Sequence, residues 1–414
     1  MSPTSHRFIR ITLTLIVLAL AVYVACNRTI FVMGVIFPMF TLTLGSMILI
    51  LFSVRPRRDD AVFVVALTLL HAVVAYMLLY NWYHSFLWVA FAGISSFWVL
   101  CVRTIWAPDA ERKVLQYATF CAVLLLTVES SVASTLKWAE RMHPKSLDLF
   151  LYSFDGSLGT QISFQMGMAF ARWHLLRSTS VYFYEGLPVA IALVCAQQIA
   201  ARKGKALSTV TALVATGPIG VATYNLFPAL GPRLISLWQF PFHPLTRVQT
   251  MNLPLVEIAA VGPRNAIPSL HMAWVLLIWW YSRGLSWWVR AVAFLFLIFT
   301  VAATIGTGEH YFIDLVVGFP FAVFMETLCS FDMPWRSRPK IIAFVWGVGA
   351  VLTWLALLRF APALFWISPI IPWGMVVVTI ALSIIFERGL HAPVELNVGA
   401  LLAAPSATPN LISS

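Results

Sequence analysis

The chain has 414 residues, of which 60% are hydrophobic and only 10% are charged. Soluble domains carry about 25% charged residues, so this composition excludes a soluble or disordered chain and predicts a polytopic membrane protein. Lys and Arg outnumber Asp and Glu by 27 to 16, for a net charge of +11, but no basic run lies within exposed polar sequence. We therefore expect no nucleic-acid partner and look to the membrane for the meaning of the charge.

Apolar runs of about 20 residues, the length that crosses a bilayer, recur along the chain and predict an all-α protein with about twelve transmembrane helices. The predicted spans cover residues 8–26, 30–54, 61–80, 86–105, 114–133, 181–201, 207–227, 266–282, 286–305, 311–330, 341–360 and 364–386. Residues 158–176 are moderately apolar but interrupted by Gly and Gln, which favours an interfacial or re-entrant piece.

The positive charges orient these spans. With a cytoplasmic N-terminus, 17 of the 27 Lys and Arg residues lie in inner loops, against 14 if residues 158–176 crossed the membrane. The positive-inside rule therefore favours twelve spans with both termini cytoplasmic. Loops 134–180 and 228–265 then lie on the extracytoplasmic or luminal face. They are basic against the rule, which suggests an anionic ligand there.

The first chemical motif, Pro268-Ser269-Leu270-His271, directly precedes an apolar run. Proline suits the first turn of a helix, where its missing N–H costs nothing. The amides of Ser269 and Leu270 would then be uncommitted, and a helix start with free amides is a ready phosphate site. Ser269 is therefore a candidate phosphate ligand.

The second motif, His310-Tyr311-Phe312-Ile313-Asp314, opens the predicted span 311–330. On a helix, His310 and Asp314 are four residues apart and share one face. A carboxylate there can hold one imidazole nitrogen as N–H and leave the other as a nucleophile. An ionisable residue inside an apolar span is also a functional candidate by default.

The spacing of the motifs brings the two histidines to one membrane face. Between His271 and His310 lie 38 residues, enough for one span inward and one span back. Span 207–227 ends on the same face and delivers the segment that contains Arg233. Two histidines and a cation suit phosphoryl transfer, in which one imidazole attacks phosphorus and the other protonates the leaving group.

These motifs resemble the second and third motifs of the type-2 phosphatidic acid phosphatase superfamily. With Phe227-Pro228-Ala229-x-Gly231-Pro232, they are most similar to its inositol phosphorylceramide synthase branch, whose members are inositolphosphotransferases. The resemblance covers residues 114–330 and implies a six-helix core that acts on a membrane lipid phosphate without metal or cofactor. It further implies that His310 forms a phosphohistidine, that Asp314 orients it, and that His271 is the general acid.

The chain departs from the family pattern at two phosphate-binding positions. Ala303 and Thr304 stand where the third motif usually has Ser-Arg, and Leu226 stands where the first motif usually has Lys. We expect Arg233 and Arg264 to replace these cations. The departure weighs more against phosphatidate hydrolysis than against phospho-head-group transfer to a lipid hydroxyl, and both reactions stay open. Residues 1–113 with four spans, residues 331–388 with two, and the tail 389–414 have no counterpart in the resemblance.

Other interpretations remain open at this point. A twelve-span secondary transporter of an anionic solute is the main alternative, although the two halves show no internal repeat. A lipid-carrier glycosyltransferase would need paired carboxylates in an outer loop, and Asp148 and Asp155 are the candidates. The His310–Asp314 pair alone could be structural. It could also bind zinc, but the sequence offers no third ligand at suitable spacing.

Overall fold

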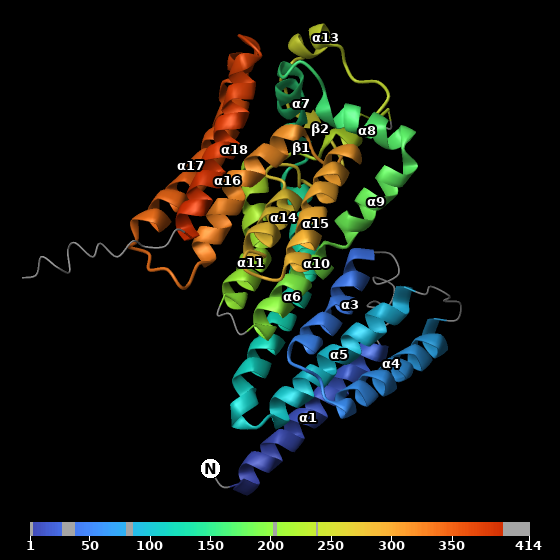
Figure 1. Cartoon of the computed structure of the whole chain (residues 1–414). Coiled ribbons are helices and arrows are strands. Elements are labelled where there is room, and N and C mark those ends of the chain that lie inside the picture. Colours follow the sequence, from blue (N-terminus) through green and yellow to red (C-terminus); the bar gives the residue numbers. More distant parts are fainter. Residues whose placement is uncertain (1–2, 27–37, 80–85, 202–204, 237–238, 392–414) are drawn as a thin grey trace, which may run out of the picture.

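The computed structural model describes residues 3–26, 38–79, 86–201, 205–236 and 239–391. Within them the structure is almost entirely helical, and its only strands form one two-residue antiparallel pair (Figure 1). The predicted all-α class is therefore confirmed. Most of the predicted tail 389–414, from residue 392 on, lies outside the described residues, as does the beginning of the predicted span 30–54.

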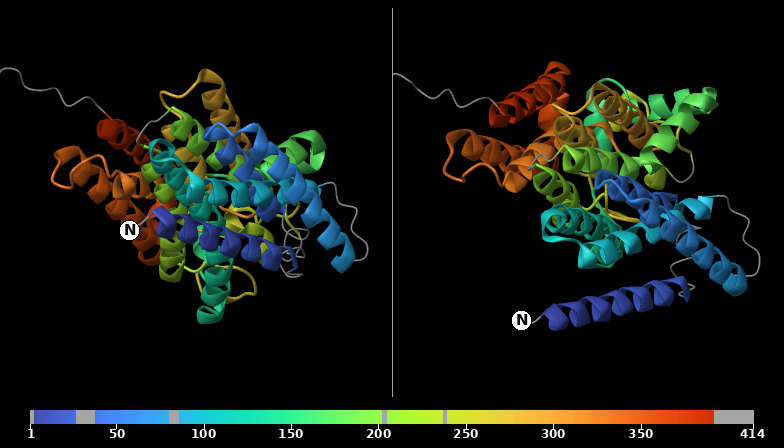
Figure 2. Two further views of the ribbon diagram at one scale, coloured as in Figure 1. Left: turned by 90° about the horizontal axis from the view of Figure 1, so that it is seen from below. Right: turned by 60° about the horizontal axis from the view of Figure 1, so that its bottom comes forward.

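The helices form three groups in chain order, and the first and last groups flank the central one on different sides (Figures 1 and 2). The N-terminal group contains α1 (Pro3–Cys26), α3 (Pro38–Ser53), α4 (Arg58–Leu79) and α5 (Phe86–Trp106), and the long α6 (Asp109–Met142) leads from it into the core. The core contains α10 (Leu187–Ala200), α11 (Ala206–Leu226), α14 (Leu270–Tyr281), α15 (Trp287–Gly306) and α16 (Phe312–Cys329). The C-terminal group contains α17 (Arg338–Phe360), the 3-10 helix η1 (Pro362–Trp366) and α18 (Ile370–His391).

Short elements gather where α14 and α16 begin. They are β1 (Lys145–Ser146), α7 (Asp148–Ser157), α8 (Ile162–Arg172), α9 (His174–Glu185), α12 (Pro232–Ile235), α13 (Arg247–Met251) and β2 (Ile258–Ala259). The two strands pair Lys145 with Ala259 and Ser146 with Ile258, which ties the two long predicted loops together. Because α8 has only 11 residues, it is too short to cross a bilayer.

Seven described helices are long and apolar enough to cross a membrane, namely α4, α5, α11, α15, α16, α17 and α18. The helices α9 and α10 meet at a 52° bend and make an eighth if they form one broken span. The multi-pass membrane assignment is thus confirmed. Each of the twelve predicted segments coincides with a helix, but the described helices give seven or eight spans by length and composition instead of twelve.

The predicted span 266–282 shows why the numbers differ. Its helix, α14, begins only at Leu270 and has 12 residues, or about 18 Å of length, against about 30 Å of hydrocarbon. The residues before it are not helical and run into the interior of the protein, where Ala266 and Ile267 are fully buried. The start of α14 therefore lies inside the protein, where it can meet other helix ends.

The helix α16 is the most enclosed of the seven candidate spans, with 78% of its apolar window buried. It packs against α11 and α14 on one side and against α17 and α18 on the other (Figure 1). A hydrogen bond from the Trp274 indole N–H to the Leu213 carbonyl, at 2.8 Å, fixes α14 to α11. A helix buried on all sides can hold an ionisable residue such as Asp314 away from lipid.

Candidate active site

The beginning of α14 is capped by Ser269. Its hydroxyl oxygen accepts a hydrogen bond from the Met272 amide at 3.3 Å, as an N-cap residue does. The amide of Ser269 itself donates to the backbone carbonyl of Asp314 at 3.0 Å. The prediction of a free Ser269 amide is therefore wrong, because Pro268 precedes the cap and does not occupy the first turn. The bond instead joins the beginning of α14 to the first turn of α16.

His310 lies just before α16, and its position depends on a helix cap. Tyr311 is the N-cap residue, and the Asp314 carboxylate accepts the Tyr311 amide N–H at 2.8 Å. The same carboxylate oxygen lies 3.4 Å from Nδ1 of His310. The predicted contact between His310 and Asp314 thus exists, although only Asp314 is helical and the cap, not a shared helix face, brings the two side chains together.

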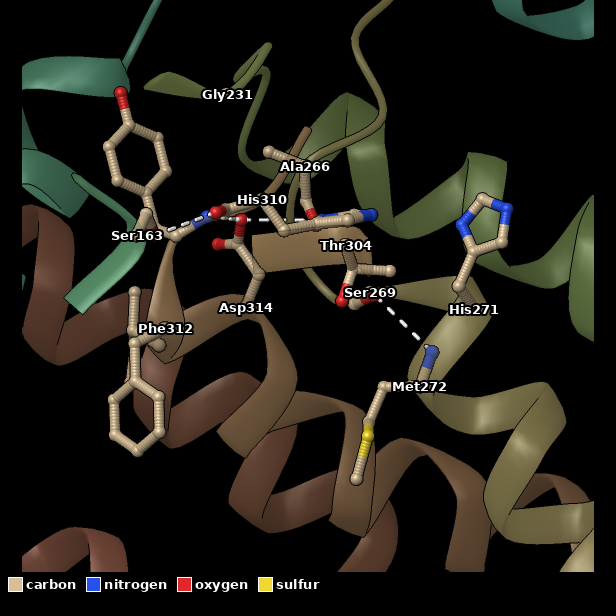
Figure 3. Close-up of polar contacts among 12 residues, drawn as sticks. Ser163, Gly231, Ala266, Ser269, His271, Met272, Thr304, His310, Phe312 and Asp314 are labelled. Carbon is tan, nitrogen blue, oxygen red and sulfur yellow. Dashed lines mark hydrogen bonds and ion pairs between the residues drawn. The ribbon is translucent and has the colours of Figure 1, made fainter. Parts of the chain in front are cut away.

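His310 is held by hydrogen bonds to its side chain and to its own backbone (Figure 3). Nδ1 donates to the Ala266 carbonyl oxygen at 2.9 Å, a stronger contact than the 3.4 Å approach of Asp314. The His310 amide donates to the Thr304 carbonyl, and its own carbonyl accepts from the Ser163 hydroxyl. Since a carbonyl can only accept, Nδ1 carries the proton and Nε2 keeps a lone pair.

His271 is the partner that faces this ring. The centroids of the two imidazoles are 6.0 Å apart, with an interplanar angle of 67°, and the His310 ring points toward His271 (Figure 3). On its other side His271 stacks on Tyr184 at 4.2 Å, and Trp274 meets it edge-on at 5.5 Å. The aromatic rings fix the orientation of His271, so a group bound at one imidazole is within reach of the other.

The segment around Arg233 lies against the third motif, as its predicted membrane face requires. Gly231 has φ 122°, and a Cβ there would lie 2.3 Å from the Glu309 carbonyl oxygen, so the close approach needs glycine. The Arg233 amide donates to the Gly308 carbonyl at 3.0 Å. Its guanidinium pairs with Glu309 at 3.0 Å and is 50% exposed. Arg233 is thus a half-exposed cation paired with Glu309, the residue before His310 in the chain.

Arg264 was predicted to bind phosphate, but its guanidinium is occupied by backbone carbonyls. Its side chain is fully buried and donates to three carbonyl oxygens, two donors to His143 and one each to Gly262 and Ala260, at 2.7–3.0 Å. Burial lowers the pKa of the Arg264 guanidinium, which the charge of Asp148 opposes. With four of its five N–H donors committed, Arg264 joins loops and is not available as a phosphate clamp.

Asp148 and Asp155 support the site through hydrogen bonds, a role that was not predicted from the sequence. Asp148 accepts the amides of Leu230 and Gly231 and the hydroxyl of Tyr311. Asp155 accepts the amides of Phe312 and Ile313, the first two residues of α16, at 2.8 and 3.2 Å. Their spacing of seven residues in a helical stretch placed both carboxylates on one helix face, which was the available signal.

The burial of α7 raises the pKa of both carboxyl groups. Desolvation raises the pKa of Asp148, and the hydrogen bonds from the Gly231 and Leu230 amides lower it by less. Desolvation also raises the pKa of Asp155 to about 8, and the charge of Asp314 adds to the rise. A neutral Asp155 still accepts amide N–H groups, so it can cap α16 without placing a second full charge beside Asp314.

The histidines of the site are not part of a metal-type cluster. Among the residues that the structure describes, one group has metal-ligand spacing, and it consists of Glu326, Glu387 and His391. It lies at the other end of α16. His271 and His310 do not belong to that group.

A comparison with protein families agrees with this geometry. Residues 149–328 match the PAP2 superfamily. The PAP2 region runs from α7 through most of α16 and so contains His271, His310 and Asp314. No curated protein and no solved structure gives a significant match. The match supports a phosphatase-type enzyme with a lipid or phosphate-ester substrate, and it gives no support to the anion transporter.

Proposed function

We propose that the protein is an integral membrane lipid phosphotransferase or phosphatase that works through a phosphohistidine on His310. The observation that carries the proposal is the pair of imidazoles with centroids 6.0 Å apart, one of which has its Nδ1 bound to a carbonyl. This pairing supplies a nucleophile with a defined lone pair and a second group that can transfer a proton.

The reaction divides into two displacements at phosphorus. In the first, Nε2 of His310 attacks the phosphorus atom, the bond to the leaving oxygen breaks, and His271 gives that oxygen a proton. In the second, an acceptor hydroxyl passes its proton to His271 and attacks phosphorus, and the P–N bond breaks. The Ala266 carbonyl keeps the proton on Nδ1 throughout, and Asp314 stabilises the positive charge that the ring gains.

The phosphate oxygens need cations or amide donors nearby. Arg233 is the candidate cation, since its guanidinium is half exposed and, within the described part of the chain, pairs with Glu309 alone. The N-terminus of α14, capped by Ser269, contributes the positive end of the helix dipole beside His271. A substrate phosphate would compete with Glu309 for Arg233, which makes this residue a test of binding.

Transfer of a phospho-head group to a lipid hydroxyl is the reaction that we favour over hydrolysis. The His310 side chain is only 1% exposed, so water has restricted access to the phosphorylated ring. The head group is expected to be similar to inositol phosphate, following the motif forms of the inositolphosphotransferase branch. On the basis of the positive-inside rule applied to the twelve segments predicted from the sequence, we place both termini in the cytoplasm and the histidines on the extracytoplasmic or luminal face.

The direct test uses purified full-length protein and labelled phospholipids, inositol phospholipid included, with and without ceramide or diacylglycerol. We expect transfer or release of the labelled phosphate group, and a labelled chain that is stable to alkali but not to acid. Both signals should disappear in His310→Ala, and turnover should fall by at least about 10²-fold in His271→Ala. The matched control is His243→Ala, since His243 is exposed in an outer loop.

Two results would end the proposal. Turnover that survives both His310→Ala and His271→Ala would mean that neither imidazole takes part. Uptake of an anionic solute into vesicles without any chemical change would return the transporter to first place.

A further inference from the structure

A second group of ionisable side chains lies at the far end of α16 from His310. Glu326 occupies the last turn of α16, and Glu387 and His391 occupy the last turns of α18, which packs along α16 (Figure 1). Both glutamates are fully buried, and the His391 side chain is 30% exposed. The cluster therefore has one side open to small solutes and two carboxylates within the protein.

The three side chains converge on one point. Nε2 of His391 lies 2.9 Å from Oε1 of Glu326 and 3.7 Å from Oε1 of Glu387, and all three ligand atoms lie within 4.8 Å of one another. Arg283, from the turn after α14, makes two 2.6 Å contacts with the carboxylate of Glu387. Oε2 of Glu326 is buried and has no hydrogen-bond partner among the described residues.

A count of charges shows what the cluster lacks. Glu326 and Glu387 bring two negative charges, and Arg283 brings one positive charge, which leaves one buried negative charge uncompensated. Burying such a charge is costly unless it is paired. A proton on His391 would balance the total, but it would still leave Oε2 of Glu326 without a partner. A divalent cation supplies the missing positive charge and can be coordinated by the Glu326 carboxylate.

We propose that Glu326, Glu387 and His391 form a binding site for a divalent transition-metal ion such as Zn²⁺. Donors at about 2.0–2.1 Å from a tetrahedral zinc ion lie roughly 3.3 Å apart, and the 2.9 and 3.7 Å separations bracket that value. One imidazole and two carboxylates suit zinc better than Mg²⁺ or Ca²⁺, which prefer oxygen ligands alone. Arg283 then supports the metal through Glu387.

The metal ion would have a structural role, since it joins the end of α18 to the end of α16. Its ligands stand at the opposite end of α16 from His310, so the site is independent of the phosphoryl-transfer proposal. The fourth zinc position is left to water on the exposed side of His391. A site of this kind stabilises the folded chain in proportion to metal binding.

The test uses untagged full-length protein in detergent, stripped with EDTA and then given Zn²⁺ or Co²⁺. We expect about one zinc ion per chain by elemental analysis, a rise in the unfolding temperature with Zn²⁺ but not with Mg²⁺, and tetrahedral Co²⁺ absorption bands. Affinity should fall at least about tenfold in His391→Ala and Glu326→Gln. His243→Ala, which changes an exposed histidine elsewhere, should bind like the wild type.

His391→Ala is the decisive variant, because its side chain lies at a partly exposed helix end and its loss leaves the core packing intact. Equal zinc uptake by wild type and His391→Ala would overturn the proposal, as would absence of the cobalt bands in wild type. Stabilisation by Mg²⁺ in place of Zn²⁺ would also overturn it. In any of these cases the four side chains are a salt-bridge network without a metal ion.

Discussion

Substitution of Arg264 tests whether this residue stabilises the fold or binds the substrate. The sequence predicts that it binds phosphate, whereas in the structure its guanidinium gives four hydrogen bonds to three backbone carbonyls. Two of these carbonyls, those of Ala260 and Gly262, belong to the loop after β2, and the third belongs to His143 before β1. The variant Arg264→Met keeps most of the side-chain length and removes all four bonds.

The cost follows from the groups left behind. A buried polar group that loses its partner costs about 1–3 kcal/mol, so three fully buried carbonyls would cost roughly 3–9 kcal/mol. These three are part-buried, and access to water brings the cost toward the lower end of that range. Native proteins are stable by only about 5–15 kcal/mol. Arg233, by contrast, makes one half-exposed ion pair with Glu309, and such pairs contribute about 0–1 kcal/mol. Arg264→Met should therefore unfold the protein far more readily than Arg233→Ala.

Thermal unfolding in detergent and steady-state kinetics distinguish the two arginines. We expect Arg264→Met to lower the unfolding temperature and the yield of monodisperse protein strongly, with kcat and KM changing only as folded protein is lost. Arg233→Ala should unfold at the wild-type temperature but show a raised KM for the phospholipid. Arg264→Lys should lie between, since an ammonium group cannot reproduce the planar fork of donors.

One result would refute this reasoning. If Arg264→Met unfolds at the wild-type temperature and its defect is confined to KM, the guanidinium binds substrate phosphate as the sequence predicted. The buried position among the carbonyls would then not describe the working protein.

Asp155→Asn should remove a pH dependence of stability. The pKa of Asp155 is about 8 in the folded protein and about 3.9 in the unfolded chain, so between these pH values the native state holds a proton that the unfolded chain releases. The free energy of unfolding therefore falls as pH rises from about 4 to 8, by at most about 1.4 kcal/mol per pH unit. Asn imitates the neutral acid, so unfolding temperatures measured across this range should lose that slope; an unchanged slope would contradict the assignment. Gly231→Ala should lower kcat by at least about tenfold, because its Cβ strikes the backbone beside His310. Gly159→Ala is its control, with a similar positive φ of 97° but open space around the new Cβ, and equal kinetic losses in both variants would refute the argument.

The helical class and the positions of the main helices could be predicted from hydrophobic runs alone. The beginning of α14 could not, because it depends on a local competition: Ser269 caps the helix, and Pro268 stays outside it. The number of spans depends on the same kind of detail. A 12-residue helix that begins inside the protein is apolar enough to be read as a span, yet its preceding residues are buried by contacts that the sequence pattern does not contain.

The two histidines could be predicted to meet because one helix running inward and the next running back return the chain to the same end of the bundle. The environment of the arginines is different in kind. Arg233 and Arg264 both lie in the predicted loop 228–265, and only the packing of this segment decides that one is half exposed and the other is buried. The support by Asp148 and Asp155 also depends on tertiary contacts, since their partners lie more than 80 residues away along the chain.

The hydrogen bonds around His310 make the two histidines parts of one backbone arrangement. The Ala266 carbonyl that fixes the Nδ1–H tautomer lies in the non-helical segment leading into α14, the helix that carries His271. The Ser269 amide at the cap of α14 donates back to the Asp314 carbonyl in the first turn of α16. A shift of either helix start would therefore change the distance between the imidazoles and also release the proton position on His310. In the proposed mechanism, nucleophile and acid are thus positioned by the same pair of bonds, and Asp314 can serve mainly as a helix cap and a counter-charge.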